Sequence, residues 1–198
     1  DGNNLFLTQE FRPSNELPSL HSLGLIDADL DGDLDLLIIQ EAGSDQFILY
    51  LNQGIDDTGS PIFEESFTYN DVEGMSRILA IADYDNDGDQ DIYVGRKFDK
   101  NWLFENQTLT GSPGYVTFNS NPNPIFIEKA EELNIADANV HEEFGSMGYG
   151  AAWGDYDNDQ DFDLYLTNWG DNRLFKNEAN TFSNVADIYH VESDSLSN

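Results

Sequence analysis

Five aspartates occupy every second position of the segment DYDNDQDFD, residues 155–163. The same spacing occurs in DADLDGDLD at 27–35 and in DYDNDGDQD at 83–91. Neighbouring carboxylates repel one another by ~1 kcal/mol at about 4 Å in water, and by more where water is partly excluded. Aspartate and asparagine also compete for the backbone hydrogen bonds of a helix, and the segments are too polar for buried strands. We therefore interpret each segment as a loop built around a cation.

Short apolar segments flank each of the three loops and would hold it in place. Before the loops stand LGLI (23–26), ILAIA (78–82) and GAAWG (150–154), and after them stand LLII (36–39), IYV (92–94) and LYL (164–166). Segments of this length and composition are typical of strands. Each loop is therefore predicted to connect the two strands of an antiparallel hairpin, with its carboxylates folded inward.

Further repeated residues define a longer unit. LYLN (49–52), LFEN (103–106) and LFKN (174–177) follow the three loops, and a phenylalanine then opens the next unit, giving Phe6, Phe63, Phe126 and Phe182. A period of about 60 residues with about four short strands per copy is typical of propeller blades or a related β-array.

The predicted fold is therefore all-β, with three four-stranded propeller-type blades plus the first strand of a fourth. The expected boundaries form one repeat array, with units at about 1–60, 61–122 and 123–178 and the start of a fourth at 179–198. Repeat counting identifies the repeated unit but not whether the units close into a ring, so a closed propeller and an open array are both alternatives. The third unit has a longer approach to its loop, and IEKAEELNI (127–135) is interpreted as one or two helical turns in a surface insertion.

The stretch GYGAAWGDYDNDQDFDLYLTNWGDNRLFKN, residues 148–177, resembles the FG-GAP or VCBS-type repeat of extracellular β-propellers such as integrin α-subunit heads and acidic matrix proteins. Weaker similarity in the other two units extends the resemblance over nearly all of the chain. It implies a four-stranded blade with calcium in the hairpin loop. The ligands implied by this resemblance are the side chains of aspartates one, three, five and nine, namely Asp27, Asp29, Asp31, Asp35, Asp83, Asp85, Asp87, Asp91, Asp155, Asp157, Asp159 and Asp163, and the carbonyls of residue seven, namely Asp33, Asp89 and Asp161.

The donor chemistry suits calcium at these three sites. Calcium takes 6 to 8 oxygen ligands and tolerates irregular geometry, whereas magnesium resists losing so much of its water. Zinc is disfavoured because the loops contain neither histidine nor cysteine. Four carboxylates would saturate each ion and leave little room for an activated water, so a structural role is expected and not a catalytic one.

The sixth position of each loop must bend sharply. Gly32 and Gly88 occupy it in the first two loops, and a positive φ is expected there. Gln160 takes this place in the third loop, where a side chain costs ~1 kcal/mol. The third loop is therefore expected to bind its ion more weakly or to be slightly reshaped.

Composition limits the partners of this chain. It has 39 acidic and 8 basic residues and a net charge of −31, which argues against nucleic acid and anionic membrane surfaces. No apolar run is long enough to insert into a membrane, and Asp1 is interpreted as a processed or excised start. Extracellular modules bind calcium in the ~10⁻⁴ to 10⁻³ M range, so an extracellular or cell-surface location is expected. The sequon at Asn106 fits secretion, but its glycosylation is left open.

Other residues give weaker indications. His21, His141 and His190 occupy dissimilar places in the repeats, and no serine lies in a Gly-x-Ser-x-Gly elbow, so no enzyme activity is predicted. Trp153 is expected in the core, and Trp169 is the better candidate for an exposed sugar-stacking ring.

The predicted function is a calcium-binding extracellular structural or adhesion module. Residues 1–11 resemble 178–188, and equivalent ends favour a fibre subunit joined head to tail by strand addition, or a piece completed by neighbouring blades of a longer chain. Its expected partners are calcium, other copies or blades, and an extracellular protein or glycan. The alternatives are a carbohydrate-binding lectin and accessory blades of a polysaccharide-degrading enzyme.

Overall fold

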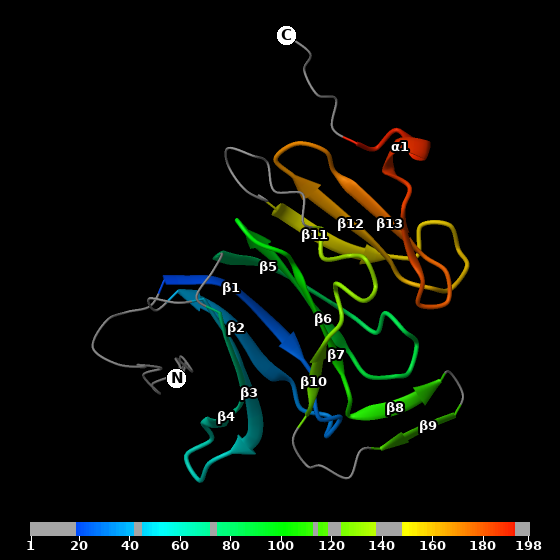
Figure 1. The fold of residues 1–198 in the computed structure, drawn as a ribbon. Coiled ribbons are helices and arrows are strands. Elements are labelled where there is room, and N and C mark those ends of the chain that lie inside the picture. Colours follow the sequence, from blue (N-terminus) through cyan, green and yellow to red (C-terminus); the bar gives the residue numbers. More distant parts are fainter. Residues whose placement is uncertain are drawn as a thin grey trace, which may run out of the picture.

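The computed structural model describes residues 19–41, 45–71, 75–112, 115–118, 124–137 and 148–192. Strands form almost all of its regular structure, and three antiparallel sheets of four strands follow one another along the chain (Figure 1). The first sheet has the order β1-β2-β3-β4 and contains β1 (Ser19–Ile26), β2 (Asp35–Glu41), β3 (Asp45–Ile55) and β4 (Pro61–Asp71). The all-β prediction is confirmed.

The other two sheets repeat this plan. The second has the order β10-β7-β6-β5 and contains β5 (Met75–Ala82), β6 (Asp91–Lys97), β7 (Trp102–Asn106) and β10 (Phe126–Glu128). A separate hairpin, β8 (Leu109–Ser112) and β9 (Tyr115–Phe118), interrupts it between β7 and β10. The third has the order β11-β12-β13-β14 and contains β11 (Gly148–Gly154), β12 (Asp163–Asn168), β13 (Arg173–Asn177) and β14 (Phe182–Asn184), followed by the short helix α1 (Ala186–Tyr189).

Each aspartate-rich segment joins the first two strands of its sheet. The ladders end at the loops, where Ile26 pairs with Asp35 and Gly154 pairs with Asp163 in antiparallel register. Ala82 and Asp91 pair in the same way beside the second loop. The predicted hairpins are therefore present, and all three loops lie at the same end of their sheets.

The strands that begin at the repeated phenylalanines take a different place from the one expected. Phe63 pairs with Asn52, Phe126 with Asn106 and Phe182 with Asn177, so each phenylalanine lies in the outer strand of the preceding sheet. The strand at Phe182, predicted to begin a fourth unit, is the fourth strand of the third sheet. The sequence unit and the sheet are thus offset by one strand, because the motif Leu-x-x-Asn and the phenylalanine pair across a hairpin. Phe6 lies outside the described residues.

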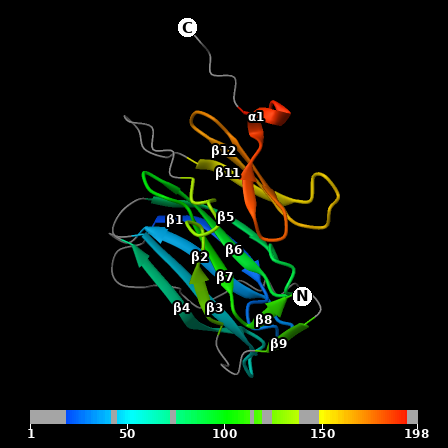
Figure 2. The same cartoon turned by 45° about the vertical axis from the view of Figure 1, so that its right-hand side comes forward.

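The three sheets stack face to face in chain order, with their first strands β1, β5 and β11 side by side (Figures 1 and 2). The second sheet is covered on both faces, since Ile92 and Val94 of β6 point toward the first sheet and Tyr93 between them points toward the third. Phe47 of the first sheet stacks on Phe104 of the second at 4.9 Å between ring centroids. Two separate hydrophobic cores result, one in each gap between sheets.

The segment predicted as a surface insertion is part of the second core. Residues 130–134 form a turn in which the Leu133 N–H donates to the Lys129 carbonyl at 3.0 Å, as in a single helical turn, and Ala130 and Ile135 are fully buried against the third sheet. The expectation of a surface segment was wrong, because only Glu131, Glu132 and Asn134 of this turn are exposed. An equivalent turn follows β14 as α1, where Ala186 is buried.

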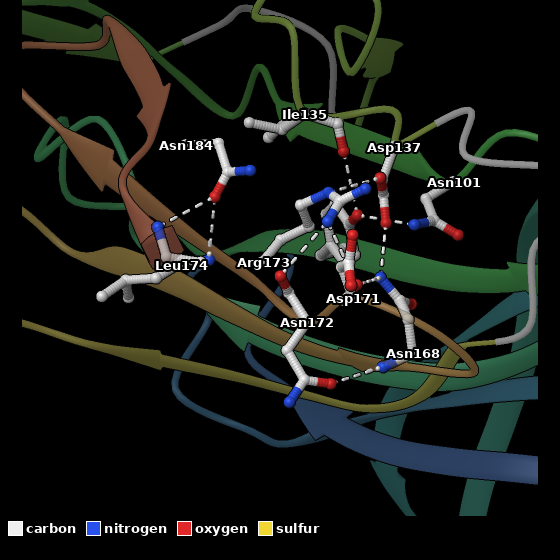
Figure 3. A network of polar contacts seen from close by, with 11 residues as sticks. Asn101, Ile135, Asp137, Asn168, Asp171, Asn172, Arg173, Leu174 and Asn184 are labelled. Carbon is white, nitrogen blue, oxygen red and sulfur yellow. Dashed lines mark hydrogen bonds and ion pairs between the residues drawn. The ribbon is translucent and has the colours of Figure 1, made fainter. Parts of the chain in front are cut away.

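A polar cluster around Asp137, which follows the turn at 130–134, joins that segment to the third sheet (Figure 3). The Asp137 carboxylate accepts hydrogen bonds from Arg173 Nε at 3.2 Å and from Asn168 Nδ2 at 2.6 Å. Both charged side chains of this pair are largely buried. Removing either partner would leave a buried charge unpaired, so the cluster fixes how the second and third sheets meet.

No helix in the described part of the chain has the length and hydrophobicity that crossing a membrane requires.

Candidate metal centres

Each loop brings three carboxylates together at its base. Counting positions from Asp27, Asp83 and Asp155, the aspartates at positions one, three and nine have carboxylate oxygens within 4.8 Å of one another. These groups are Asp27, Asp29 and Asp35, then Asp83, Asp85 and Asp91, then Asp155, Asp157 and Asp163. Because a cation bound by several carboxylates needs convergent oxygens, these groups could hold a metal ion.

The position-nine aspartate ties the loop to its sheet. In the second loop, Asp91 Oδ2 accepts the backbone N–H of Tyr84 at 3.1 Å, and Oδ1 accepts the N–H of Asn106 at 2.8 Å. The equivalent bonds to Asp35 come from Ala28 and Asn52, and those to Asp163 come from Tyr156 and Asn177. Strand registers on both sides of the loop therefore depend on this carboxylate.

The remaining aspartates shape the loop through backbone hydrogen bonds. In the second loop the position-seven N–H of Asp89 donates to Asp87 Oδ1 at 3.1 Å, and the position-six N–H of Gly88 donates to Asp83 Oδ2 at 3.0 Å. The third loop has the same two bonds, at 3.1 Å each. The carboxylates at positions one, three and nine thus lie close together, while the aspartates at positions five and seven lie in the same loops outside these groups.

The sixth position has the backbone conformation expected for glycine. Gly32 and Gly88 have φ of 95° and 105°, and Gln160 has φ of 80°. This region disfavours residues with a Cβ. The backbone of the third loop is therefore strained at Gln160, whereas the first two loops have glycine at this position.

Burial raises the pKa of carboxylates in the first two loops, so that without a cation these groups ionise less readily. Desolvation, partly offset by backbone hydrogen bonds, raises the pKa of Asp35 to about 6. Desolvation and the neighbouring Asp87 and Glu105 carboxylates raise the pKa of Asp85 to about 7. The pKa of Asp91 is raised well above its ordinary value, again chiefly by burial. A bound cation would remove this electrostatic cost.

Within the described loops, two buried carboxylate oxygens lack a hydrogen-bond partner, which is consistent with a cation site. They are Asp157 Oδ1, in the converged group of the third loop, and Asp89 Oδ1 in the second. An unsatisfied buried acceptor is costly, and native structures seldom tolerate one without an ion or water. Asp157 belongs to the predicted side-chain ligands. Asp89 was predicted to contribute only its carbonyl, and its other oxygen, Oδ2, accepts the N–H of Leu109 at 2.6 Å.

The third strand of each sheet contains the repeated asparagine of the Leu-x-x-Asn motif, and the residue just before this asparagine differs among the three units. Lys176 places its ammonium 2.7 Å from Asp157 Oδ2 and 3.6 Å from Asp159 Oδ2, and this contact lowers the pKa of Asp157. Glu105 occupies the equivalent place in the second loop and adds negative charge beside Asp85. The third loop thus has an internal cation where the second has a further carboxylate.

Replacing Lys176 by methionine should increase the calcium affinity of the third loop by about three- to tenfold, since the ammonium that competes with the ion for the Asp157 carboxylate is removed. Chelator-competition titration of both proteins with calcium would compare the affinity of the third loop. Lys129→Met removes a lysine paired with Glu132, outside the third loop, and should leave the affinity of that loop unchanged. Equal third-loop affinities in wild type and Lys176→Met would contradict the competition.

The loops are also linked to one another across the sheets. Asn106 Nδ2 donates to the carbonyl of Ala28 in the first loop at 3.0 Å, and Asn177 Nδ2 donates to that of Tyr84 in the second at 2.9 Å. Asn86 Nδ2 reaches Asp161 Oδ1 in the third loop at 3.1 Å. The repeated asparagine was visible in the sequence, but its supporting role was missed. Asn106 is fully buried, so its amide is inaccessible to glycosylation in the folded chain.

The tryptophans lie as predicted. Trp153 is partly buried and packs against the second core, with its Nε1 donating to the carbonyl of Ala80 at 3.3 Å, and Trp169 is exposed. His21 and His190 lie away from the carboxylate groups, and His141 lies outside the described residues.

A comparison with protein-family models gives one match, to a model described as an FG-GAP-like repeat, over residues 27–94. This stretch holds the first two loops, whereas the sequence resemblance is clearest at 148–177. No curated protein matches the chain. The match fits a propeller-like fold, in agreement with the stacked four-stranded sheets. The resemblance inferred from the sequence is thus confirmed over residues 27–94, which match an FG-GAP-like repeat.

Proposed function

We propose that this chain is a calcium-stabilised structural or adhesion module of an extracellular protein and not an enzyme. The observation that supports it most is the threefold recurrence of one converged carboxylate group at the hairpin of each sheet. The residues that would hold calcium are those at positions one, three and nine, with further oxygens from positions five and seven. Calcium would supply positive charge there and leave the chemistry of the chain unchanged.

A stabilising role follows from where the groups lie. Each position-nine carboxylate holds two backbone amides, one in its loop and one in the third strand. Asparagines from the second and third sheets reach the loop of the preceding sheet. An ion in each loop would therefore order the sheet that contains it and its contact with the next.

An extracellular location suits such sites, because weak calcium sites fill only where calcium is millimolar. The net charge of −31 also makes the metal-free chain repel itself, and bound divalent cations would reduce that repulsion.

The outer face of the third sheet is suited to receive another sheet of the same kind. In the second sheet, the residues that pack against the third are Ala80, Tyr84, Tyr93 and Leu103, and the same positions of the third sheet hold Ala152, Tyr156, Tyr165 and Leu174. The latter four line a cavity of about 230 Å³. The partner proposed for it is a neighbouring blade of a longer chain or a second copy. Face packing has this support, whereas strand addition by residues 1–11 falls outside the described residues.

Calorimetric titration of the chelated protein with calcium tests the proposal. We expect three calcium ions per chain and the loss of one ion in each of Asp29→Asn, Asp85→Asn and Asp157→Asn. Asp187→Asn, at an exposed position of α1, should retain all three. Absence of calcium binding, or equal binding of magnesium, would refute the assignment.

A further inference from the structure

A β-bulge interrupts the first strand of every sheet at the same place, far from the calcium loops. The register shifts between Leu20 and Ser22 in β1, between Ser76 and Ile78 in β5, and between Gly148 and Gly150 in β11. The register skips His21, Arg77 and Tyr149, which are the extra residues of the three bulges. A bulge re-aims the side chain of its extra residue, and bulges are frequent beside binding sites.

The three bulged residues form a row, because their strands lie side by side. His21 Nδ1 lies 3.0 Å from the carbonyl oxygen of Ser76, immediately before the second bulge. Arg77 and Tyr149 line one cavity of about 350 Å³ together with Ile78, Lys97 and Gly148. A cavity of this size lies in the range of small-ligand sites.

The two cations in this cavity differ from the other basic residues that the structure describes. Arg96, Lys100, Lys129, Arg173 and Lys176 each pair with a carboxylate. Within the same described ranges, Arg77 and Lys97 have no carboxylate partner; Arg77 contacts the Met75 sulfur, and Lys97 lies over the Phe98 ring at 4.4 Å. Unpaired cations are unexpected in a chain with 39 acidic and 8 basic residues, and they leave charge free to meet an anion.

Exposed aromatic rings lie at this cavity: Tyr149 lines it, and Trp169 and Phe98 lie next to its lining residues Tyr149 and Lys97. Tyr149 is 59% and Trp169 57% exposed, and their ring centroids lie 6.4 Å apart. Phe98, under Lys97, is 48% exposed. Large rings exposed together mark a contact surface more often than a chance arrangement. Tyrosine and tryptophan combine an apolar face with a hydrogen-bonding edge, which suits the apolar face of a pyranose ring and its hydroxyls.

We propose that Arg77, Lys97, Tyr149 and Trp169 form a binding site for an anionic saccharide. The guanidinium of Arg77 and the ammonium of Lys97 take the carboxylate or sulfate, and the two aromatic rings stack on the sugar. This inference goes beyond the proposed structural role and does not depend on calcium binding.

The negative charge of the calcium loops does not prevent such binding. Arg77 stands near the beginning of β5, and the second loop begins after Ala82 at its other end. Six strand residues span roughly 20 Å, which exceeds the Debye length of about 8 Å at physiological salt. A nucleic acid is a poorer ligand, since its many phosphates would meet the acidic remainder of the surface.

An array of acidic and neutral glycans, probed with the whole chain in millimolar calcium, tests the site. We expect retention on glycans that carry uronate, sialate or sulfate, weakening with added salt, and competition by free sodium glucuronate but not by glucose. Arg77→Gln combined with Lys97→Gln should lower the affinity about tenfold or more, as the loss of charge-assisted hydrogen bonds does. Trp169→Ala should also lower it, and Lys129→Gln should not.

The melting temperature of each variant in calcium shows whether it is folded, and glucuronate competition on the wild type needs no variant. Retention on no anionic glycan, equal retention of neutral and acidic glycans, or unchanged affinity in the double variant would each overturn the site. Binding of polyglutamate in place of glycans would also overturn it, in favour of an acidic protein partner. None of these results alters the count of calcium ions, so this proposal and the proposed function can fail separately.

Discussion

Removing calcium should lower the melting temperature of this chain by about 15–30 °C. For sites at the tight end of the extracellular range, with a dissociation constant of ~10⁻⁴ M, calcium at about 10 mM is present at about 100 times that constant and stabilises the folded state by about 2.7 kcal/mol per site, so three sites contribute about 8 kcal/mol. Each kcal/mol shifts the melting temperature of a domain of this size by about 2–4 °C. Calorimetry or circular dichroism in millimolar calcium, and again with excess EDTA, would measure the difference.

The design of the loops explains why the expected effect is large. Without an ion, the three carboxylates of each group lie within 4.8 Å of one another, and Asp91 and Asp35 are buried. The folded state must therefore either hold repelling charges together or take up protons. Both options weaken the hairpin that each loop closes, and the asparagines that link loops across sheets pass this weakness to the next sheet.

Matched controls separate the loops from a general effect of cations on an acidic protein. Magnesium at the same concentration should restore much less stability, because it resists exchanging its water for so many carboxylates. Asp85→Asn should remove part of the calcium effect, and Asp187→Asn should retain all of it. Equal melting temperatures with calcium and with EDTA would show that the loops do not need an ion.

Local features of the sequence were sufficient to predict the loops, the hairpins and the φ at position six. The alternating aspartates, the apolar flanks and Gly32 or Gly88 lie within about a dozen residues, and the physics that shapes them acts over that range. The repeat also predicts the all-β fold class and the number of four-stranded sheets. The position of Trp153 in an apolar strand beside a loop predicts that it packs with the core, and the structure places it against the second core.

Other features depend on contacts between distant residues and could not be derived in this way. The strands at Phe63, Phe126 and Phe182 were assigned to the next unit, because a repeat can be divided at any point without changing its period. Ala130 and Ile135 looked like part of a surface turn, since nothing nearby shows that the third sheet covers them. The ammonium of Lys176 beside Asp157 joins the third strand to the loop, a contact that only the folded sheet brings about.

Calcium should reverse the sign of the pH dependence of stability. In the metal-free fold, burial raises the pKa of Asp35 to about 6 and that of Asp85 to about 7, above their ordinary values in the unfolded chain. Between those values and about pH 4, the folded state binds more protons than the unfolded state, so its stability rises as the pH falls. The metal-free melting temperature should therefore be higher near about pH 5 than near about pH 8.

With calcium bound, the same carboxylates must be ionised, and protons compete with the ion. The melting temperature in calcium should then fall as the pH is lowered from about 8 to about 5. The ordinary pKa of a carboxylate is about 4, and the Lys176 contact lowers the pKa of Asp157, so this window reports on the carboxylates whose pKa burial raises, which include Asp163 of the third loop. Asp85→Asn should flatten the metal-free slope, and Asp187→Asn should not. Slopes of the same sign with and without calcium would mean that these carboxylates are not the groups that bind the ion.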